Sequence, residues 1–307
     1  MDITFPALAS INDSVNIAYR DGLQGGAPSV WDKFCYDASS IGSEEVYPFM
    51  AGLPGLREWV GERVVHSLSM TTFSIRNRTW ENTVAIKREN IEDDKLHTLI
   101  QPTRLLGANV KAFPDIQIAA LLKNGHSTLT YDGQNFFDVA HPNYTDTGAP
   151  TTVANYQAGA STSWYLMDVS TAIRAFIWQT RRPFKIIPRF SLTDPVVFDN
   201  NEFVWGVDGR ANAGYGLWQF AYRSDNTLNQ ANIIAARTAM ATLRRQDGTP
   251  MGLGAAGQLV MVVPTALASL AQAYATNEND PNPPTAGTLQ PNQVRGQFKA
   301  LENQFLN

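Results

Sequence analysis

The chain has 307 residues, of which 44% are hydrophobic and 17% charged, and its formal net charge is -4 at neutral pH. A chain of this length can bury a substantial core in one large domain or two smaller ones. The weak negative charge excludes an overall positive field, so we expect little nonspecific affinity for phosphate backbones or anionic lipid. Cys35 is the single cysteine, which excludes an intrachain disulfide and a cysteine-based zinc site and fits a reducing cytosol.

No targeting or membrane-spanning segment is predicted. Residues 1–22 lack the basic stretch followed by an apolar core that a secretion signal needs. The longest apolar run, around residues 259–263, is far shorter than the ~20 residues that cross a bilayer. We therefore expect no membrane partner.

Residues 1–43 combine short apolar pieces with several glycines and show no sustained helical or strand period. They predict an extended N-terminal arm with one short helix. Such an arm buries its own apolar groups poorly, so Phe5, Leu8, Trp31 and Phe34 are expected to contact a neighbouring surface. An arm folded back on its own domain is the alternative.

Residues 44–91 contain strand-like stretches around a glycine-rich tip. This pattern predicts a long projecting β-hairpin, which would be barely stable alone and would therefore dock on another surface. A short hairpin packed on its own sheet is the alternative. Trp59 is expected to anchor this docking, with Leu53, Leu56, Arg57 and Arg63 around it.

Apolar residues recur at helical spacing between residues 92 and 124, behind a group of acids. Pro102 and Pro114 are expected to kink or divide this helix into a long first segment and a shorter second one. Aromatic and β-forming residues predict mainly strands over residues 161–222. Further along, the pattern predicts a helix, a strand, a helix and a last strand, at residues 228–245, 258–264, 265–276 and 294–306.

Asp132, Asp138 and His141 lie within ten residues of one another and could supply ligands for a metal or an acid–base pair. No second cluster completes such a site. A structural turn, in which the carboxylates accept hydrogen bonds from backbone amides, is the favoured interpretation. A metal-dependent hydrolase is retained as one alternative function.

Two further patterns favour structural roles. Gly252, Gly254 and Gly257 match the glycine spacing of a dinucleotide-binding loop, but the segment that follows is a predicted strand instead of a helix, so a turn is expected. The basic stretch of Arg181, Arg182 and Lys185 makes a nucleic-acid-binding module the second alternative. Three charges are too few for specific recognition, which favours a solvated or intersubunit ion-pair role. No enzyme activity, cofactor or resident metal is predicted.

Four phrases occur in order along the chain: LPGLREWVGER at 53–63, YDGQNFFDVAHP at 131–142, FDNNEFVWG at 198–206 and AGYGLWQFA at 213–221. Together they resemble the major head subunit of Mu-like tailed bacteriophages. The resemblance implies an α+β, HK97-like capsid fold. Its expected parts are an N-terminal arm at 1–43, an extended β-hairpin called the E-loop at 44–91, a peripheral domain with a long spine helix at 92–130, a mainly axial domain with a β-rich insertion at 131–285 and a C-terminal return to the peripheral domain at 286–307.

The resemblance also implies a function. The chain would be a major capsid protein that assembles into hexamers and pentamers of an icosahedral head enclosing double-stranded DNA. It would be made and assembled in the host bacterial cytoplasm and reside in the virion. The implied partners are further copies of the chain, a separate scaffolding protein, a portal, an optional decoration or cementing protein, and packaged double-stranded DNA held by weak nonspecific contact.

Two details are expected of the assembled shell. The segment before the hairpin is too short for a fused scaffolding domain, so the N-terminus is expected to be retained. Some proteins of the implied fold cross-link a lysine of the hairpin to an asparagine of a neighbour, whereas residues 52–62 contain no lysine here. Shells without covalent cross-links are therefore expected.

Overall fold

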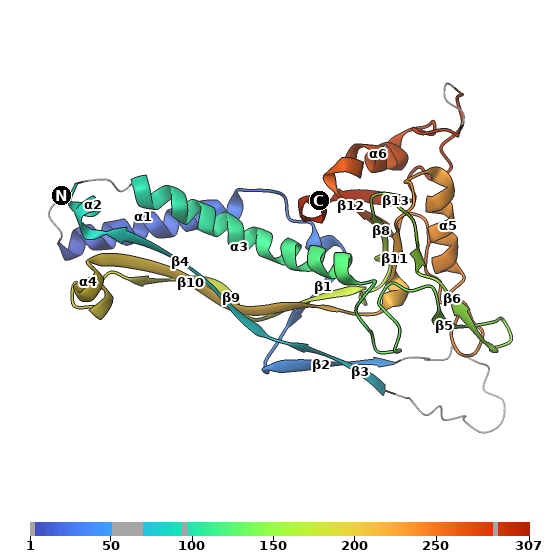
Figure 1. Ribbon diagram of the computed structural model, residues 1–307, viewed down its shortest axis with the longest axis horizontal. Helices are drawn as coiled ribbons and strands as arrows, with labels where there is room; N and C mark the ends of the chain where they lie inside the picture. Colours follow the sequence, from blue (N-terminus) through green and yellow to red (C-terminus); the bar gives the residue numbers. More distant parts are fainter. Residues whose placement is uncertain (1–3, 51–69, 94–96, 285–287) are drawn as a thin grey trace.

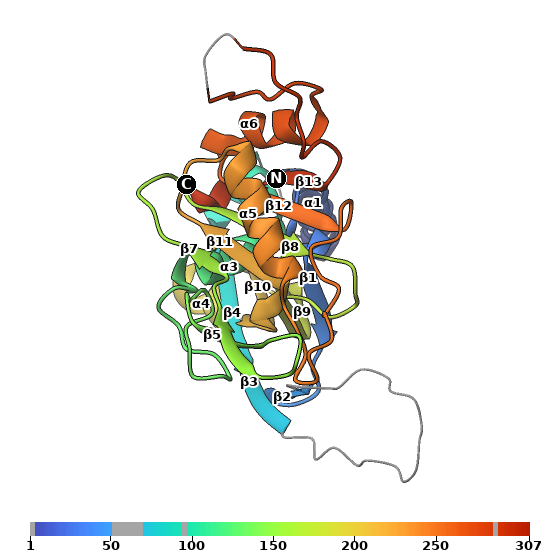
Figure 2. The ribbon, with the colours of Figure 1, turned by 90° about the vertical axis from the view of Figure 1, so that its right-hand side faces the viewer.

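The computed structural model describes residues 4–50, 70–93, 97–284 and 288–307. It has two parts, a long body and a compact end, which follow one another along the longest axis (Figure 1). The long body contains a four-stranded sheet, and the compact end contains a five-stranded sheet. Figure 2 views the molecule from the compact end. Helices and sheets are mixed throughout, as the α+β expectation requires.

The long body takes its elements from distant parts of the chain. Its sheet has the strand order β1-β9-β10-β4, with β1 parallel to β9 and the other pairs antiparallel. Burial alternates along β10, so that Phe203, Trp205 and Val207 pack toward the helices. The elements of the body are α1 (Phe5–Gln24), β1 (Cys35–Ser39), β4 (Arg78–Lys87), α2 (Arg88–Glu92), α3 (His97–Asn124), β9 (Phe176–Arg189), α4 (Pro195–Asn200) and β10 (Glu202–Tyr215).

The N-terminal segment is a 20-residue helix, α1, and the prediction of an extended arm with one short helix is wrong. The side chain of Thr4 accepts a hydrogen bond from the amide of Ala7 and caps the helix, and Pro6 lies in its first turn. Leu8 is buried against Ile91 and Leu99 of the same chain. The alternative of an arm folded back on its own domain is therefore the correct one for this helix.

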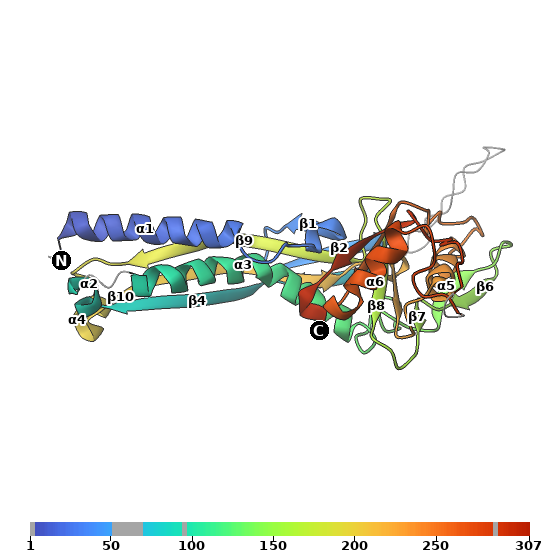
Figure 3. The same ribbon diagram turned by 90° about the horizontal axis from the view of Figure 1, so that it is seen from above.

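Helices α1 and α3 lie side by side along the body (Figure 3). Two glycines permit their close approach. A Cβ atom added at Gly22 would lie 2.0 Å from the carbonyl oxygen of Arg104, and one at Gly107 would lie 2.3 Å from that of Tyr19. Both distances are far below van der Waals contact, so the two backbones touch where any larger residue would separate them.

Helix α3 runs without a break over 28 residues and contains both Pro102 and Pro114, so the predicted division is wrong. Packing explains its continuity, because Leu106, Ile118 and Leu122 are buried along its length. By length and composition alone the stretch Leu99–Asn124 could cross a membrane. Its contacts with α1 and the sheet identify it as a core helix.

The compact end has the strand order β13-β12-β8-β11-β7. Helices α5 and α6 and the buried strand β12 share one apolar cluster. The strands and helices predicted after residue 161 are confirmed, with shifted ends. The elements are β7 (Tyr156–Gln157), β8 (Trp164–Asp168), β11 (Ala221–Ser224), α5 (Gln230–Ala241), β12 (Leu259–Val263), α6 (Thr265–Thr276) and β13 (Phe298–Glu302), beside a separate ribbon of β5 (His141–Tyr144) and β6 (Pro150–Val153).

The strand pairing bears on two of the expected domain limits. Residues 176–215, expected in the axial part, supply β9 and β10 to the long body, where they pair with β1 and β4. The last strand, β13, pairs in parallel with β12 of the compact end, where Phe298 and Leu259 are buried in the same cluster. The residues after this strand, Gln304–Leu306, contact α3 of the long body.

Candidate functional site

A β-hairpin projects from the long body as a sheet of its own (Figure 1). It consists of β2 (Glu44–Met50) and β3 (Met70–Arg76), which pair antiparallel from Glu44 opposite Arg76 to Met50 opposite Met70. The predicted hairpin is thus confirmed, but it is shorter than the expected range 44–91. Residues 78–87 form β4, which leaves the hairpin and pairs with β10 along its whole length.

Among the described residues of the hairpin, those at its base pack on the body. Ile75 is buried against Ala38 and Ile177, with Tyr47 and Phe73 beside them. Ile41 and Val46 near the same base remain largely exposed. Because a two-stranded hairpin is marginally stable alone, exposed apolar side chains on it indicate a surface that is completed by another molecule.

The predicted anchor of this hairpin lies outside the described residues. Leu53, Leu56 and Trp59 belong to the stretch 51–69, as do Arg57 and Arg63. Their role in contacts between subunits stays a prediction.

Phe34 is not available for the predicted contact with a neighbour, whereas the contact predicted for the partly exposed Trp31 stays a prediction. Phe34 is fully buried in the chain's own core, where its ring lies edge-on to Phe176 at 6.4 Å. Trp31 is partly buried, with its ring 5.9 Å from that of Trp178. The carboxylate of Asp115 on α3 accepts hydrogen bonds from the Val30 and Trp31 amides at 3.1 and 2.9 Å. These contacts hold the segment after α1 on its own domain.

A second exposed apolar region lies at the far end of the long body. Phe5 at the start of α1 is 75% exposed, and Phe198 on α4 is 85% exposed. Leu192, in the turn before α4, is also exposed. Figure 1 places α4 and the start of α1 at the same end of the molecule. Phe198 opens the phrase FDNNEFVWG and was not predicted to lie on the surface.

The cluster of Asp132 and His141 is a buried structural contact. Nδ1 of the fully buried His141 donates to Oδ2 of Asp132 at 2.8 Å, and the imidazole stacks on Trp218 with ring centres 3.8 Å apart. Burial alone would raise the pKa of Asp132, but hydrogen bonds from His141, Thr130 and the Gln134 amide outweigh it and hold that pKa below its ordinary value.

Asp138 does not join this pair. Its Oδ1 accepts hydrogen bonds from the amides of Val139 and Ala140 at 2.7 and 3.1 Å, which is the turn geometry predicted for it. Within the described ranges, no group of three acidic, histidine or cysteine residues is placed to hold a metal ion. The arrangement supports a folded turn and offers no assembled hydrolase site.

The basic stretch lies on β9 and is partly neutralised by its own chain. Arg182 forms an ion pair with Asp208 of β10 at 2.6 Å. Lys185 stands opposite the same Asp208 in the strand register. The predicted ion-pair role is therefore seen for Arg182, within the chain instead of between subunits.

The three predicted turn glycines all have positive φ angles. The amide of Gly254 donates to Oδ2 of Asp168 at 2.7 Å, and strand β12 follows. A turn before a strand cannot present a helix N-terminus to a phosphate. This confirms the turn interpretation.

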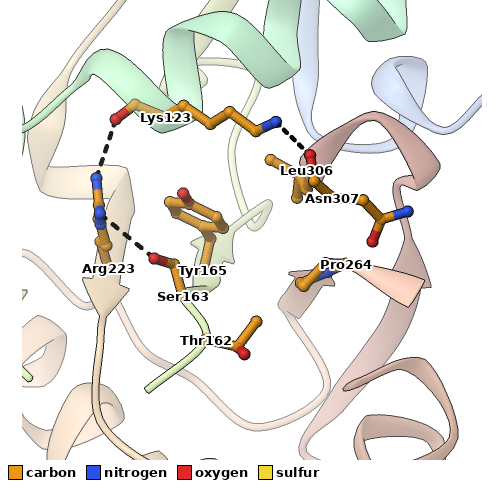
Figure 4. A pocket seen from close by; sticks show the side chains of 8 residues that line it. All are labelled: Lys123, Thr162, Ser163, Tyr165, Arg223, Pro264, Leu306 and Asn307. Carbon is orange, nitrogen blue, oxygen red and sulfur yellow. Dashed lines mark hydrogen bonds between the residues drawn. The ribbon is translucent and has the colours of Figure 1, made fainter. Parts of the chain in front are cut away.

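A pocket of about 280 Å³ lies between α3, β8, β11 and the last residues of the chain (Figure 4). Arg223 lines it, and each N–H of its guanidinium group already has a partner, in Asp225, Ser163, His126 and the Lys123 carbonyl. Nζ of Lys123 donates to the backbone oxygen of Asn307 at 2.9 Å. The pocket lies at a polar interface between the long body and the compact end.

The geometry so far describes an elongated subunit with exposed apolar regions and no assembled reactive centre among the described residues. Comparison with known proteins agrees with it. The chain is 32% identical to the major capsid protein of Escherichia phage Mu over 94% of this chain and 96% of that protein. It is also 32% identical to the Mu-like prophage FluMu major head subunit of Haemophilus influenzae, over 74% and 75% of the two chains.

Solved structures show the same fold. A chain of the bacteriophage JBD30 procapsid matches with a TM-score of 0.79 and 32% identity, covering 99% of this chain and all of that one. The bacteriophage JBD30 capsid matches with a TM-score of 0.74 and 25% identity, covering 92% of each chain. The model of the Mu-like prophage major head subunit gpT family matches residues 8–306, and the chain belongs to this family of phage head proteins.

Proposed function

We propose that this chain is the major capsid protein of a Mu-like phage or prophage and that it acts by assembling with copies of itself. The observation that carries the proposal is the match of nearly the whole chain to a procapsid chain at a TM-score of 0.79. The match includes both parts of the molecule, as expected for a subunit whose entire shape is used in a shell. The family consists of structural head proteins, so the hydrolase and nucleic-acid-binding alternatives are not supported.

The parts of the fold take the roles that an HK97-like capsid protein needs. In this proposal α3 is the spine helix of the peripheral domain, the compact end is the axial domain, and the β2–β3 hairpin is the E-loop. Hexamers and pentamers of an icosahedral shell then repeat the same contacts many times.

The exposed apolar regions are the proposed contacts between subunits. The hairpin docks on one neighbour, with Trp59 of the stretch between its two strands as the proposed anchor, and the far end with Phe5 and Phe198 meets another. Apolar area that is removed from water contributes about 25 cal/mol per Å². Each contact can therefore be modest while the closed shell, in which every subunit makes several, is stable.

The remaining partners are also proposals. A relative's capsid is described as decorated with minor capsid protein trimers, which supports a decoration protein here. A separate scaffolding protein, a portal and weakly held double-stranded DNA complete the proposed set. Because the subunit has a net charge of -4, its attraction to DNA phosphates is weak, and the shell is expected to enclose DNA without binding it tightly.

Sedimentation and light scattering of the purified full-length chain test the proposal. We expect particles of many subunits at moderate concentration, in equilibrium with free subunits of 33.8 kDa. A protein that stays monomeric or dimeric under all conditions, including with its head-assembly partners present, would contradict it. Metal analysis and a salt-dependent DNA titration on the same sample address the two alternatives.

A further inference from the structure

A polar cluster with three buried members lies where the hairpin leaves the body. We call it the hinge cluster and define it as Ser40, Glu45, Tyr47, Asn77 and Gln179. Ser40, Asn77 and Gln179 are 3%, 6% and 0% exposed, although all three are polar. Burial of polar groups costs free energy unless they are hydrogen-bonded, so these contacts need a role that apolar residues could not fill.

Gln179 on β9 connects the body to both strands of the hairpin. Its Nε2 donates to Oδ1 of Asn77 at 2.8 Å and to the carbonyl oxygen of Ile75 on β3 at 3.2 Å. Its Oε1 accepts a hydrogen bond from the Tyr47 hydroxyl of β2 at 2.8 Å. Burial raises the pKa of Tyr47 to about 12, so this hydroxyl stays protonated and can donate.

Asn77 connects the segment that leads into the hairpin to the segment that leads out of it. It is the residue between β3 and β4, and its Nδ2 donates to Oγ of Ser40 at 2.7 Å and to the carbonyl oxygen of Gly42 at 2.9 Å. Its amide donates to the carbonyl oxygen of Ser43 at 2.9 Å. The two connecting segments are thus fastened to each other.

Glu45 shapes the entering turn. Its Oε1 accepts hydrogen bonds from the amides of Gly42 and Ile41 at 2.8 and 2.7 Å and from the Ser40 hydroxyl at 2.8 Å. These three donors lower the pKa of Glu45. The carboxylate therefore holds the turn 40–43 against the base of β2.

The apolar contacts at the hairpin base would allow it to tilt, because the hydrophobic effect has no direction. Hydrogen bonds are directional, and a buried network that is fully paired permits one arrangement. We propose that Gln179 and Asn77 are positioning residues that fix the angle at which the hairpin projects, so that its tip meets a neighbouring copy of the chain in one orientation. The inference rests on the proposed role of the hairpin in assembly.

Hydrogen exchange of unassembled full-length subunits tests directly whether the hinge cluster holds the hairpin in place. Gln179→Met keeps the length of the side chain and removes its donor and acceptor. Amides of residues 44–47 and 73–76 should exchange about 30-fold faster, which corresponds to about 2 kcal/mol at 1.4 kcal/mol per tenfold. Gln157→Met is the matched control, because the half-buried Gln157 bonds Asn232 and Ser224 in the compact end. It should leave the hairpin amides unchanged.

The double variant Asn77→Ala with Gln179→Met separates one cluster from two independent contacts. If the two residues act together, the double variant accelerates exchange clearly less than the product of the single effects. Multiplicative effects would overturn the joint role. Should Gln179→Met fail to fold, Tyr47→Phe removes a single hydroxyl, and several-fold faster exchange of the hairpin is then expected. No acceleration in either variant would overturn the inference.

Assembly is measured on the same samples. Gln179→Met should lower the yield of closed particles about tenfold, whereas Gln157→Met should not. If the exchange rates of the hairpin amides do not change, the proposed positioning role of the hinge cluster is refuted, whatever the particle yield. Faster exchange with full particle yield instead refutes the proposed docking of the hairpin, because assembly would then not depend on its angle.

Discussion

Replacing Gly107 by alanine tests the close approach of α1 and α3. In an isolated helix this change stabilises by about 1 kcal/mol, because alanine is the better helix former. In the structure the added Cβ would lie 2.3 Å from the carbonyl oxygen of Tyr19, a backbone atom that cannot rotate away. Overpacking of this kind costs about 1–3 kcal/mol, and a contact this short belongs at or above the upper end.

The net expectation is a loss of about 2 kcal/mol in the free energy of unfolding, measured by urea denaturation of unassembled subunits. Asn109→Ala is the control, since Asn109 lies two residues further along α3 and is exposed. It should leave stability unchanged or raise it by a few tenths of a kcal/mol. A Gly107→Ala subunit as stable as the parent would refute the close packing of α1 on α3.

Further variants and conditions address other features of the molecule. Trp59→Ala should leave the free subunit folded by circular dichroism and weaken shells, because a projecting tip adds little to its own core; unfolding of the subunit, or shells as heat-resistant as the parent, would show that Trp59 is not the anchor. Asp138→Asn and His141→Ala should impair folding or assembly, the second by about 3 kcal/mol for a buried stacked ring. A stoichiometric metal that disappears with either substitution would instead revive the hydrolase. The pKa of Asp132 is lowered in the fold, so its contribution to stability is present above its ordinary value of 3.8 and is lost as pH falls through the lowered value. Urea titrations from pH 5 to pH 3 should therefore show a smaller decline for Asp132→Asn than for the parent, and equal declines would contradict the assignment. Denaturing electrophoresis of boiled shells should show one band near 33.8 kDa. A ladder of covalent oligomers would contradict the expectation drawn from lysine placement.

The position of Lys87 supports the expectation that shells form without lysine cross-links. Lys87 is the one lysine within residues 44–91, the expected range of the hairpin. It ends β4, ten residues long, whereas the hairpin joins the other end of that strand. At about 3.3 Å per residue, Lys87 is roughly 30 Å away along the strand.

Local patterns predicted the elements whose packing follows directly from the sequence. The run LVMVV is buried at every position of β12, and α6 begins directly after Pro264. The hairpin was also predicted from its strand-like stretches and the glycine-rich sequence between them. Helix α1 was missed because polar residues such as Asn12, Asp13 and Ser14 weaken its helical signal, and contact with α3 compensates for them.

Long-range pairing explains the remaining errors. Phe34 looked like an exposed arm residue, and only the pairing of β1 with β9, some 140 residues later, encloses it. The hinge cluster could not be foreseen either, since Asn77 and Gln179 are 102 positions apart. The local periodicity of apolar residues in a sequence does not indicate such a contact.

Cryo-electron microscopy of particles formed by the purified chain tests the proposed function most directly. The account predicts closed shells built from rings of six and of five copies, with α3 and the compact end resolved in each copy and the β2–β3 hairpin lying on an adjacent one. Particles in which the hairpin contacts only its own subunit, or preparations that contain no shells, would contradict it.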